Sequence, residues 1–202
     1  MVCAQRRCGF DYAERLYVNN LYPEQHILPS AMLHHNIEWV AEGGTRFISM
    51  PRRTPFFLYV GWTLPHNPEV LTSLQADPRL TPGGLWGGFN RSAVVAARAR
   101  ACQLANVSTE ALLPLADARG KQAVPMATPN AIPEPRFGHR HYPLALAWMD
   151  SGVGSLMEAL RESDQWQNTL TIFTSDHAAY DKAHCYTGEL IYRTPSMRVS
   201  HS

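Results

Sequence analysis

"TLTIFTSDHAAYDKAHCYTGE", residues 169–189, passes from an apolar, β-branched run into a stretch rich in charged and histidine side chains. The run from Thr169 to Thr174 predicts a fully buried strand. Asp176 and His177 come almost directly after it, and Lys182 follows a few residues later. In open α/β sheets, ligands bind in the crevice outside the carboxyl ends of the strands. The stretch therefore predicts a strand that leads into a functional site.

A second strand of the same kind is predicted earlier in the chain. Phe56 to Trp62 is a short, continuous, aromatic-rich run with Pro55 before it and Pro65 after it. Such a run is typical of a buried central strand in a parallel or mixed sheet. His66 stands directly after Pro65. Both predicted strands thus end in polar side chains, and we expect these side chains to share one edge of the sheet.

Helical patterns surround the two strands. Residues 30–41 place Leu33, Ile37 and Val40 on one face, and Gly43-Gly44 is expected to end that helix. Residues 92–105 predict a helix opened by Ser92. A third helix follows Pro143, which suits a first turn. Its apolar stripe comprises Leu144, Trp148, Val153, Leu156, Met157 and Leu160, with Gly152 and Gly154 as weak points.

The order strand, helix, strand predicts an α/β fold. We expect one partial domain over residues 1–202, in which residues 78–141 form a long, loop-rich insertion. Proline and glycine are frequent in that insertion, and prolines at 114, 125, 129, 133 and 135 disfavour regular structure there.

Composition excludes several classes of function. The chain has 202 residues, a formal charge of +1, 45% hydrophobic and 17% charged residues, which is the composition of a globular protein. The near-neutral charge gives no reason to expect nucleic acid as a partner. No run approaches the ~18 apolar residues that a transmembrane helix needs. The N-terminal residues contain no apolar signal core, and the four cysteines (Cys3, Cys8, Cys102, Cys185) are scattered, so reduced thiols are at least as plausible as disulfides.

Each candidate side chain has a functional and a structural interpretation. Asp176 offers hard anionic oxygen for a divalent cation, and His177 offers a metal ligand or a donor to an anion. Lys182 and His184 carry charge suited to a tetrahedral anion. Against this, an aspartate at a strand end is often a cap or turn former, and a single Pro-His pair is more often structural. Cys185 is interpreted as a packed residue, and four histidines are interpreted as surface residues: His34, His35, His139 and His141.

The chain resembles the sulfatase family, which is arylsulfatase-like and belongs to the alkaline-phosphatase superfamily. Two segments together carry the resemblance: "PFFLYVGWTLPHNP" (55–68) and "MDSGVGSLMEALRESDQWQNTLTIFTSDHAAYDKAHCYTGE" (149–189). The matching positions are His66, Asp150 with Val153-Gly154, Asp176-His177, and Lys182 with Tyr186 and Gly188. The resemblance implies part of an alkaline-phosphatase-like sheet flanked by helices. It also implies a Ca²⁺ site with Asp176 and His177 as two ligands, and a sulfate-ester substrate gripped by His66 and Lys182, which assist the leaving group.

The chain departs from the family pattern in three respects. An early Asp-Asp metal pair and the C/S-x-P-S-R motif, whose Cys or Ser becomes the formylglycine nucleophile, do not occur in it. Gly188-Glu189 replaces the usual Gly-Gly pair, and the C-terminal subdomain is absent. We therefore expect a fragment of a sulfatase whose isolated chain is inactive, because a sulfuryl group has no acceptor without a nucleophile. A secreted or lysosomal parent would fit the family.

Two other functions stay open on the sequence. The first is hydrolysis of phosphate mono- or diesters, since related phosphoryl-transfer enzymes also use an Asp-His pair after a strand. An upstream Thr or unmodified Ser nucleophile would favour it. The second is a non-catalytic remnant that binds anions or partners, or that does not fold. In such a remnant Phe56, Phe57, Tyr59 and Trp62 would be poorly covered, which is an aggregation hazard.

Overall fold

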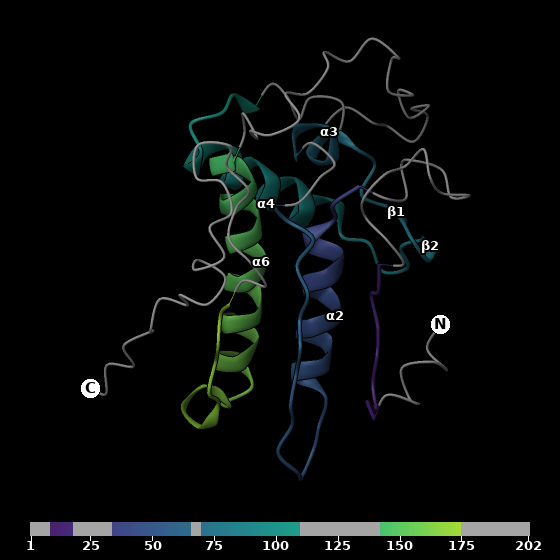
Figure 1. Ribbon diagram of the computed structural model, residues 1–202, viewed down its shortest axis with the longest axis vertical. Coiled ribbons are helices and arrows are strands. Elements are labelled where there is room, and N and C mark those ends of the chain that lie inside the picture. The colour runs from purple at the N-terminus through teal and green to yellow at the C-terminus, as the bar shows by residue number, and fades with distance from the viewer. Residues whose placement is uncertain (1–8, 18–33, 66–69, 110–141, 175–202) are drawn as a thin grey trace, which may run out of the picture.

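The computed structural model describes residues 9–17, 34–65, 70–109 and 142–174, and two helices packed side by side form the frame of this part of the chain (Figure 1). Helix α2 spans Ile37–Ser49 and helix α6 spans Tyr142–Glu162. They pack side by side and run in the same direction, down the view of Figure 1. Neither these nor the other described helices are long and apolar enough to cross a membrane.

Helix α2 differs from its prediction at both ends. It begins after Asn36, whose Oδ1 accepts a 3.1 Å hydrogen bond from the Trp39 backbone N–H, so the helix starts later than the predicted residue 30. It also continues through Gly43-Gly44 to Ser49. A Cβ on Gly44 would lie 2.6 Å from Leu156 Cδ2. The glycine is therefore a contact with α6 rather than a helix end.

Helix α6 confirms the third predicted helix, with Pro143 in its first turn. Its buried side chains include Leu144, Trp148 and Leu160, as the apolar stripe predicts. Gly152 is buried, and a Cβ there would lie 2.5 Å from Ile37 Cγ2 and 2.9 Å from the Trp62 ring. The predicted weak point is thus a position at which α2 and α6 approach closely.

Residues 56–62 follow α2 as an extended segment, but the expected central strand is wrong in two respects. First, the segment forms no β ladder with any described residue. Second, only alternate side chains are covered: Phe56, Leu58 and Val60 pack against the cluster between α2 and α6. Phe57 and Tyr59 are 76% and 74% exposed on the other side. The period of two shows a strand-like segment with one covered face.

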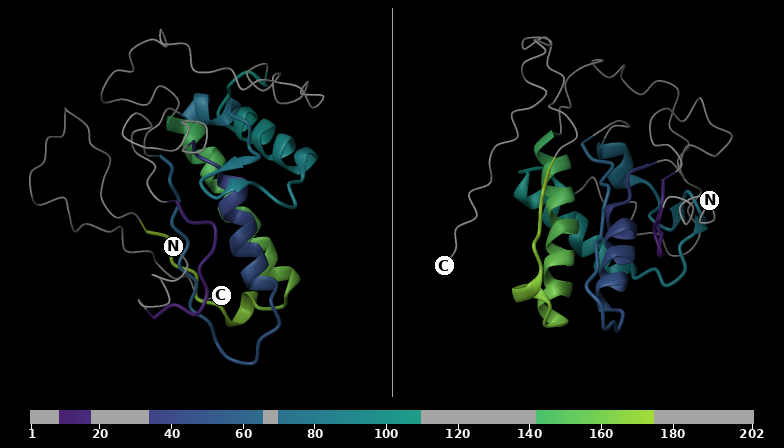
Figure 2. Two further views of the ribbon diagram at one scale, coloured as in Figure 1. Left: turned by 90° about the vertical axis from the view of Figure 1, so that its right-hand side faces the viewer. Right: turned by 60° about the horizontal axis from the view of Figure 1, so that its bottom comes forward.

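Residues 169–174 return along α6 in the same manner (Figure 2). Thr169 has extended backbone angles, φ −118° and ψ 121°. Leu170 and Ile172 are 77% and 73% exposed, so the fully buried strand predicted here is also wrong for the described residues. Each extended segment runs back toward the end of the frame at which α2 and α6 begin (Figures 1 and 2). The chain thus contains two helix-then-extended-segment units side by side.

Helices α3 and α4 and a small β pair lie at that same end of the frame (Figure 1). Helix α3 spans Val70–Gln75, and a small antiparallel pair joins β1 (Leu80–Thr81) to β2 (Gly84–Leu85). Helix α4 spans Arg91–Leu104, which confirms the predicted helix, although its cap is Asn90 and not Ser92. The first part of the predicted insertion therefore has regular structure. The 3₁₀ helix η4, Trp166–Asn168, follows α6.

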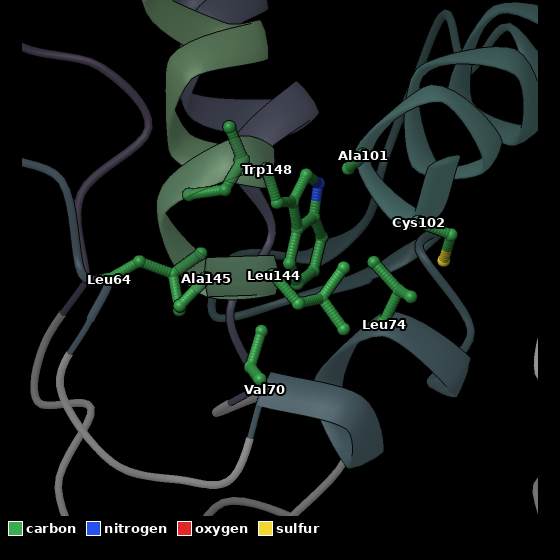
Figure 3. Close-up of a cluster of buried hydrophobic side chains, with 9 residues drawn as sticks. Leu64, Val70, Leu74, Ala101, Cys102, Leu144, Ala145 and Trp148 are labelled. Atoms are coloured by element: carbon green, nitrogen blue, oxygen red, sulfur yellow. The ribbon is translucent and has the colours of Figure 1, made fainter. Parts of the chain in front are cut away.

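The largest apolar cluster joins α3, α4 and α6 (Figure 3). Trp148 and Leu144 of α6 meet Leu74 of α3 and Ala101 of α4, all with 0% exposure. Cys102, in the same cluster, is a buried free thiol. Two smaller clusters extend the core along α2, one around Trp39 and Trp86 and one around Ile48 and Leu156. Burial of these side chains, at about 25 cal/mol per Å² of apolar surface, holds the helices together.

Candidate functional site

The predicted site residues His66, Asp176, His177 and Lys182 lie outside the described residues, as do His139, His141, His184 and Cys185. One described range stops at Pro65, immediately before His66, and another stops at Thr174, shortly before Asp176. The structure therefore describes the residues that precede these positions and the contacts that hold them. That support is best defined around the end of the 56–65 segment, where α2, α3 and α4 meet.

His35, just before α2, contacts two residues that lie 28 and 38 positions further along the chain. Its Nδ1 lies 2.7 Å from Thr63 Oγ1, and its backbone N–H donates to Ser73 Oγ at 3.2 Å. Thr63 precedes His66 along the chain, and Ser73 belongs to α3, which follows it. His35 is only 1% exposed, so its interpretation as a surface residue is wrong. Its hydrogen-bond partners explain why the imidazole can be buried.

The residues on either side of His35 take part in the same junction. Asn36 Nδ2 donates a 2.7 Å hydrogen bond to the Pro78 carbonyl, just beyond α3. His34 Nδ1 lies 3.4 Å from Ser73 Oγ. Burial, helped by the positive charge of Arg98, lowers the pKa of His34 to about 4. His34 is therefore neutral at pH 7, and its interpretation as an ordinary surface histidine is also wrong.

Arg98 of α4 also supports α3, through contacts at its C-terminal end. Its guanidinium, 1% exposed, donates from Nη1 to the Leu74 carbonyl at 2.5 Å and to the Ala76 carbonyl at 3.2 Å. Leu74 belongs to the last turn of α3 and Ala76 directly follows the helix, so neither carbonyl has a partner within the helix. The same guanidinium faces Glu38 at 3.4 Å. A buried arginine that satisfies a helix end is thus part of the junction.

Tyr17 completes the junction from the N-terminal described segment. Its hydroxyl donates a 2.8 Å hydrogen bond to the His34 carbonyl, and burial raises its pKa well above the ordinary value. The phenol therefore stays protonated and works as a donor. Sequence reasoning identified none of these supporting residues. The one available signal was Asn36, a favoured cap residue ahead of an apolar run.

Metal-ligating side chains do not cluster in the part of the chain that the structure describes. No group of three or more His, Cys, Asp or Glu side chains converges among residues 9–17, 34–65, 70–109 and 142–174 in a way suited to a metal ion. The buried guanidinium of Arg98 already has two backbone carbonyls and the Glu38 carboxylate as acceptors. The junction thus connects Thr63, near the end of the described range 34–65, with α3.

Comparison with known proteins identifies the class. A family model described as Sulfatase matches residues 5–195, which is nearly the whole chain and includes all four predicted site residues. The chain therefore belongs to the sulfatase family, and the resemblance inferred from its motifs is confirmed. The family implies an alkaline-phosphatase-like α/β fold and a hydrolase at the level of the family. No curated protein and no solved structure matched the chain.

Proposed function

We propose that this chain forms part of the catalytic domain of a sulfuric ester hydrolase. The observation that carries the proposal is the family match over residues 5–195, together with the order of its two motif segments. The reaction is the hydrolysis of a sulfate ester by water to an alcohol or phenol and inorganic sulfate. The sulfuryl group is transferred first to a formylglycine oxygen that a C/S-x-P-S-R motif upstream of the matched residues would supply.

His66 and Lys182 are proposed to act on the sulfate group. The ammonium of Lys182 binds an anionic sulfate oxygen, and the charge that grows on the leaving oxygen is stabilised by a nearby donor. His66 has an imidazole suited to giving that oxygen a proton, because its ordinary pKa lies close to neutral pH.

Asp176 and His177 are proposed as two of the metal ligands, with Ca²⁺ as the ion. The carboxylate of Asp176 fits the oxygen preference of Ca²⁺, whereas an imidazole nitrogen is more usual with Zn²⁺ or other transition metals. The family in general uses a divalent metal. When bound, such an ion would polarise the sulfate and neutralise its charge. Within this chain, Asp176 would hold it and His177 would contact either the ion or a sulfate oxygen.

The architecture supports bringing these groups together. Both extended segments run back toward the end of the frame at which α2 and α6 begin, and each leads directly to one group of predicted residues. His66 follows the first segment, and Asp176 with His177 follows the second. Two parallel segments with catalytic residues after their carboxyl ends form the usual arrangement of α/β sites.

The test uses the 202-residue chain and the longer protein read from its transcript upstream of Met1. We expect no turnover of an aryl sulfate by the chain alone. We expect turnover by a longer protein that contains an in-frame C/S-x-P-S-R motif and an Asp-Asp pair, with His66→Ala and Lys182→Ala lowering kcat. Preference for an aryl phosphate, with a Thr or unmodified Ser nucleophile upstream, would instead establish phosphate ester hydrolysis. Turnover of the aryl sulfate by the pure 202-residue chain would refute the requirement for an upstream nucleophile.

Metal identity is tested separately by equilibrium dialysis of the longer protein with Ca²⁺ and with Zn²⁺. Retention of Ca²⁺ that Asp176→Asn abolishes is the expected result. Retention of Zn²⁺ and not of Ca²⁺ would mean that Zn²⁺ is the bound ion. The imidazole of His177 would then be its stronger ligand.

A further inference from the structure

We propose that Trp39, Trp86 and Glu42 form a binding site for a guanidinium group, which Arg15 occupies as a ligand from the chain itself. The site lies where residues 9–17 pack against α2 (Figure 1). It does not rest on the proposed hydrolysis of sulfate esters. Its assignment comes from the side-chain contacts and the backbone conformation of Arg15.

Two indole rings supply the aromatic part of the site. The guanidinium carbon of Arg15 lies 5.6 Å from the centre of the Trp39 ring and 5.9 Å from the centre of the Trp86 ring. The two tryptophans are only 4% and 8% exposed. A cation within about 6 Å of an aromatic ring face is attracted by the ring, most strongly when the ring is an indole. One ring from α2 and one from the residue after β2 therefore favour a cation at this position.

Glu42 supplies the opposite charge. Its Oε2 pairs with Arg15 Nη2 and accepts a 3.0 Å hydrogen bond from Trp86 Nε1. The indole thus holds the carboxylate in place while the carboxylate binds the cation. A guanidinium presents planar, fixed N–H donors to a carboxylate and stacks on aromatic rings, whereas an ammonium is a strongly hydrated point charge. Two indoles and one carboxylate together therefore favour a guanidinium over an ammonium.

Gly43 provides the space for the stem of Arg15. A Cβ at this position of α2 would lie 2.4 Å from Arg15 Cγ and 3.2 Å from Arg15 Cβ. Any larger residue would therefore push the arginine side chain away from the helix. Glycine is unfavourable inside a helix compared with alanine, and here its lack of a side chain admits the ligand.

Arg15 is an imperfect ligand for this site. Its φ is +54°, in the left-handed region that residues with a Cβ rarely adopt. Its Nε is buried and has no hydrogen-bond acceptor among the described residues. Both features cost stability, which the contacts of the guanidinium must offset. A guanidinium that is not attached to the chain carries no backbone strain and can reorient. The site should therefore accept one when the Arg15 side chain is removed.

The first experiment locates the Arg15 guanidinium in the unsubstituted chain by NMR. Protons above an aromatic ring resonate upfield, so the side-chain protons next to this guanidinium should be shifted upfield. Arg46 is the internal control, because its side chain is 51% exposed and pairs with Glu14. Trp86→Leu should reduce the Arg15 shift. Arg15 resonances at the same positions as those of Arg46 would overturn the proposal.

The second experiment empties the site. Arg15→Gly removes the side chain and keeps the backbone path, because glycine adopts a positive φ freely. Asp164→Gly is the matched control, since Asp164 is exposed and has a φ of +55°. Arg15→Gly should raise the equilibrium constant of urea unfolding about tenfold, through the loss of a charge-assisted hydrogen bond and the cation–π contacts. Asp164→Gly should leave this constant unchanged or lower it.

The third experiment adds ethylguanidinium to the Arg15→Gly chain and follows the indole N–H resonance of Trp86. We expect a shift that saturates at millimolar concentrations of the cation. Ethylammonium has the same charge without the planar donors, so it should bind more weakly. Adding Glu42→Gln to Arg15→Gly should abolish the response. The unsubstituted chain should not respond, because Arg15 fills the site.

The outcomes decide the proposal without any measurement of ester hydrolysis. A saturable response that prefers ethylguanidinium and requires Glu42 supports it. Equal responses to the two cations, or a response that persists with Glu42→Gln, would overturn it. So would the absence of a response in a folded Arg15→Gly chain. Where Arg15→Gly does not fold, the Arg15 resonances of the unsubstituted chain decide.

Discussion

Trp148 Nε1 donates a 2.7 Å hydrogen bond to Glu38 Oε1, which joins α6 to α2 across the core. The guanidinium of Arg98 faces the same carboxylate at 3.4 Å and lies 4.8 Å from the centre of the Trp148 ring. Three helices therefore meet at one carboxylate whose side chain is 10% exposed. The charge of Glu38 is balanced by Arg98, and its remaining lone pairs are used by the indole.

Removing the charge of Glu38 should destabilise the chain strongly. Glu38→Gln leaves the buried guanidinium of Arg98 without a counter-charge, and breaking a buried pair in this way costs about 3 kcal/mol of unfolding free energy. Glu158→Gln is the control, because Glu158 pairs with Arg161 on the surface of α6 and should change stability by less than about 0.5 kcal/mol. Urea denaturation measures both. Equal effects of the two variants would contradict the assignment of a buried ion pair.

Gly152 and Gly154, two residues apart in α6, should respond to alanine with opposite signs. A Cβ at 152 would collide with Ile37 and Trp62, so Gly152→Ala should cost about 1–3 kcal/mol through overpacking. Nothing lies within 4 Å of a Cβ at 154. Gly154→Ala should therefore gain about 0.5–1 kcal/mol from helix propensity. Thermal unfolding measures the stability of both variants. Stabilisation by both would show that α2 and α6 do not approach at Gly152.

His34 should make stability fall in weakly acidic solution. Its pKa is about 4 in the folded chain against an ordinary 6.5, so between these values the unfolded chain binds a proton that the folded chain does not. This contribution is complete above pH 6.5 and is lost as the pH falls toward 4, by at most about 3 kcal/mol.

The measurement is urea denaturation at several pH values for the unsubstituted chain and for His34→Asn. Because the other titrating groups are common to both proteins, the difference between the two curves isolates His34. The variant should lose stability less steeply between pH 6.5 and 4. Parallel curves would show that His34 is accessible to water in the folded chain.

Tyr59 and Val60 test whether residues 56–62 have one covered face. Tyr59 is exposed and Val60 packs against two core clusters. Tyr59→Lys should change the unfolding free energy by less than about 0.5 kcal/mol, whereas Val60→Ala should cost about 1–2 kcal/mol. Tyr59→Lys should also reduce self-association in light scattering, because it interrupts an exposed apolar surface. A large loss of stability in Tyr59→Lys would indicate that both faces are covered.

Local sequence patterns predicted the parts of the fold that depend on neighbours along the chain. The apolar stripe and Pro143 defined α6, and the run between Pro55 and Pro65 defined an extended segment. The order of the motif segments identified the family, which the match over residues 5–195 confirms. The four predicted site residues remain predictions, because they lie outside the described residues.

What the sequence left undecided is which surfaces come together. Whether one face or both faces of residues 56–62 are covered depends on how many layers pack on the segment, and an apolar run is compatible with either. Gly43-Gly44 has the pattern of a helix end, yet the close approach of Leu156 makes Gly44 a contact inside α2.

The same holds for the buried polar residues. A histidine is stable in the interior only where its polar atoms have hydrogen-bond partners. The partners of His35 are Thr63 and Ser73, which the fold brings from later parts of the chain. The sequence by itself thus determined the helices, the extended segments and the family, because these follow from neighbouring residues and motif order. Only the tertiary structure decided that His35, Arg98 and Glu38 are interior, because burial of a polar group is stable only when distant partners satisfy it.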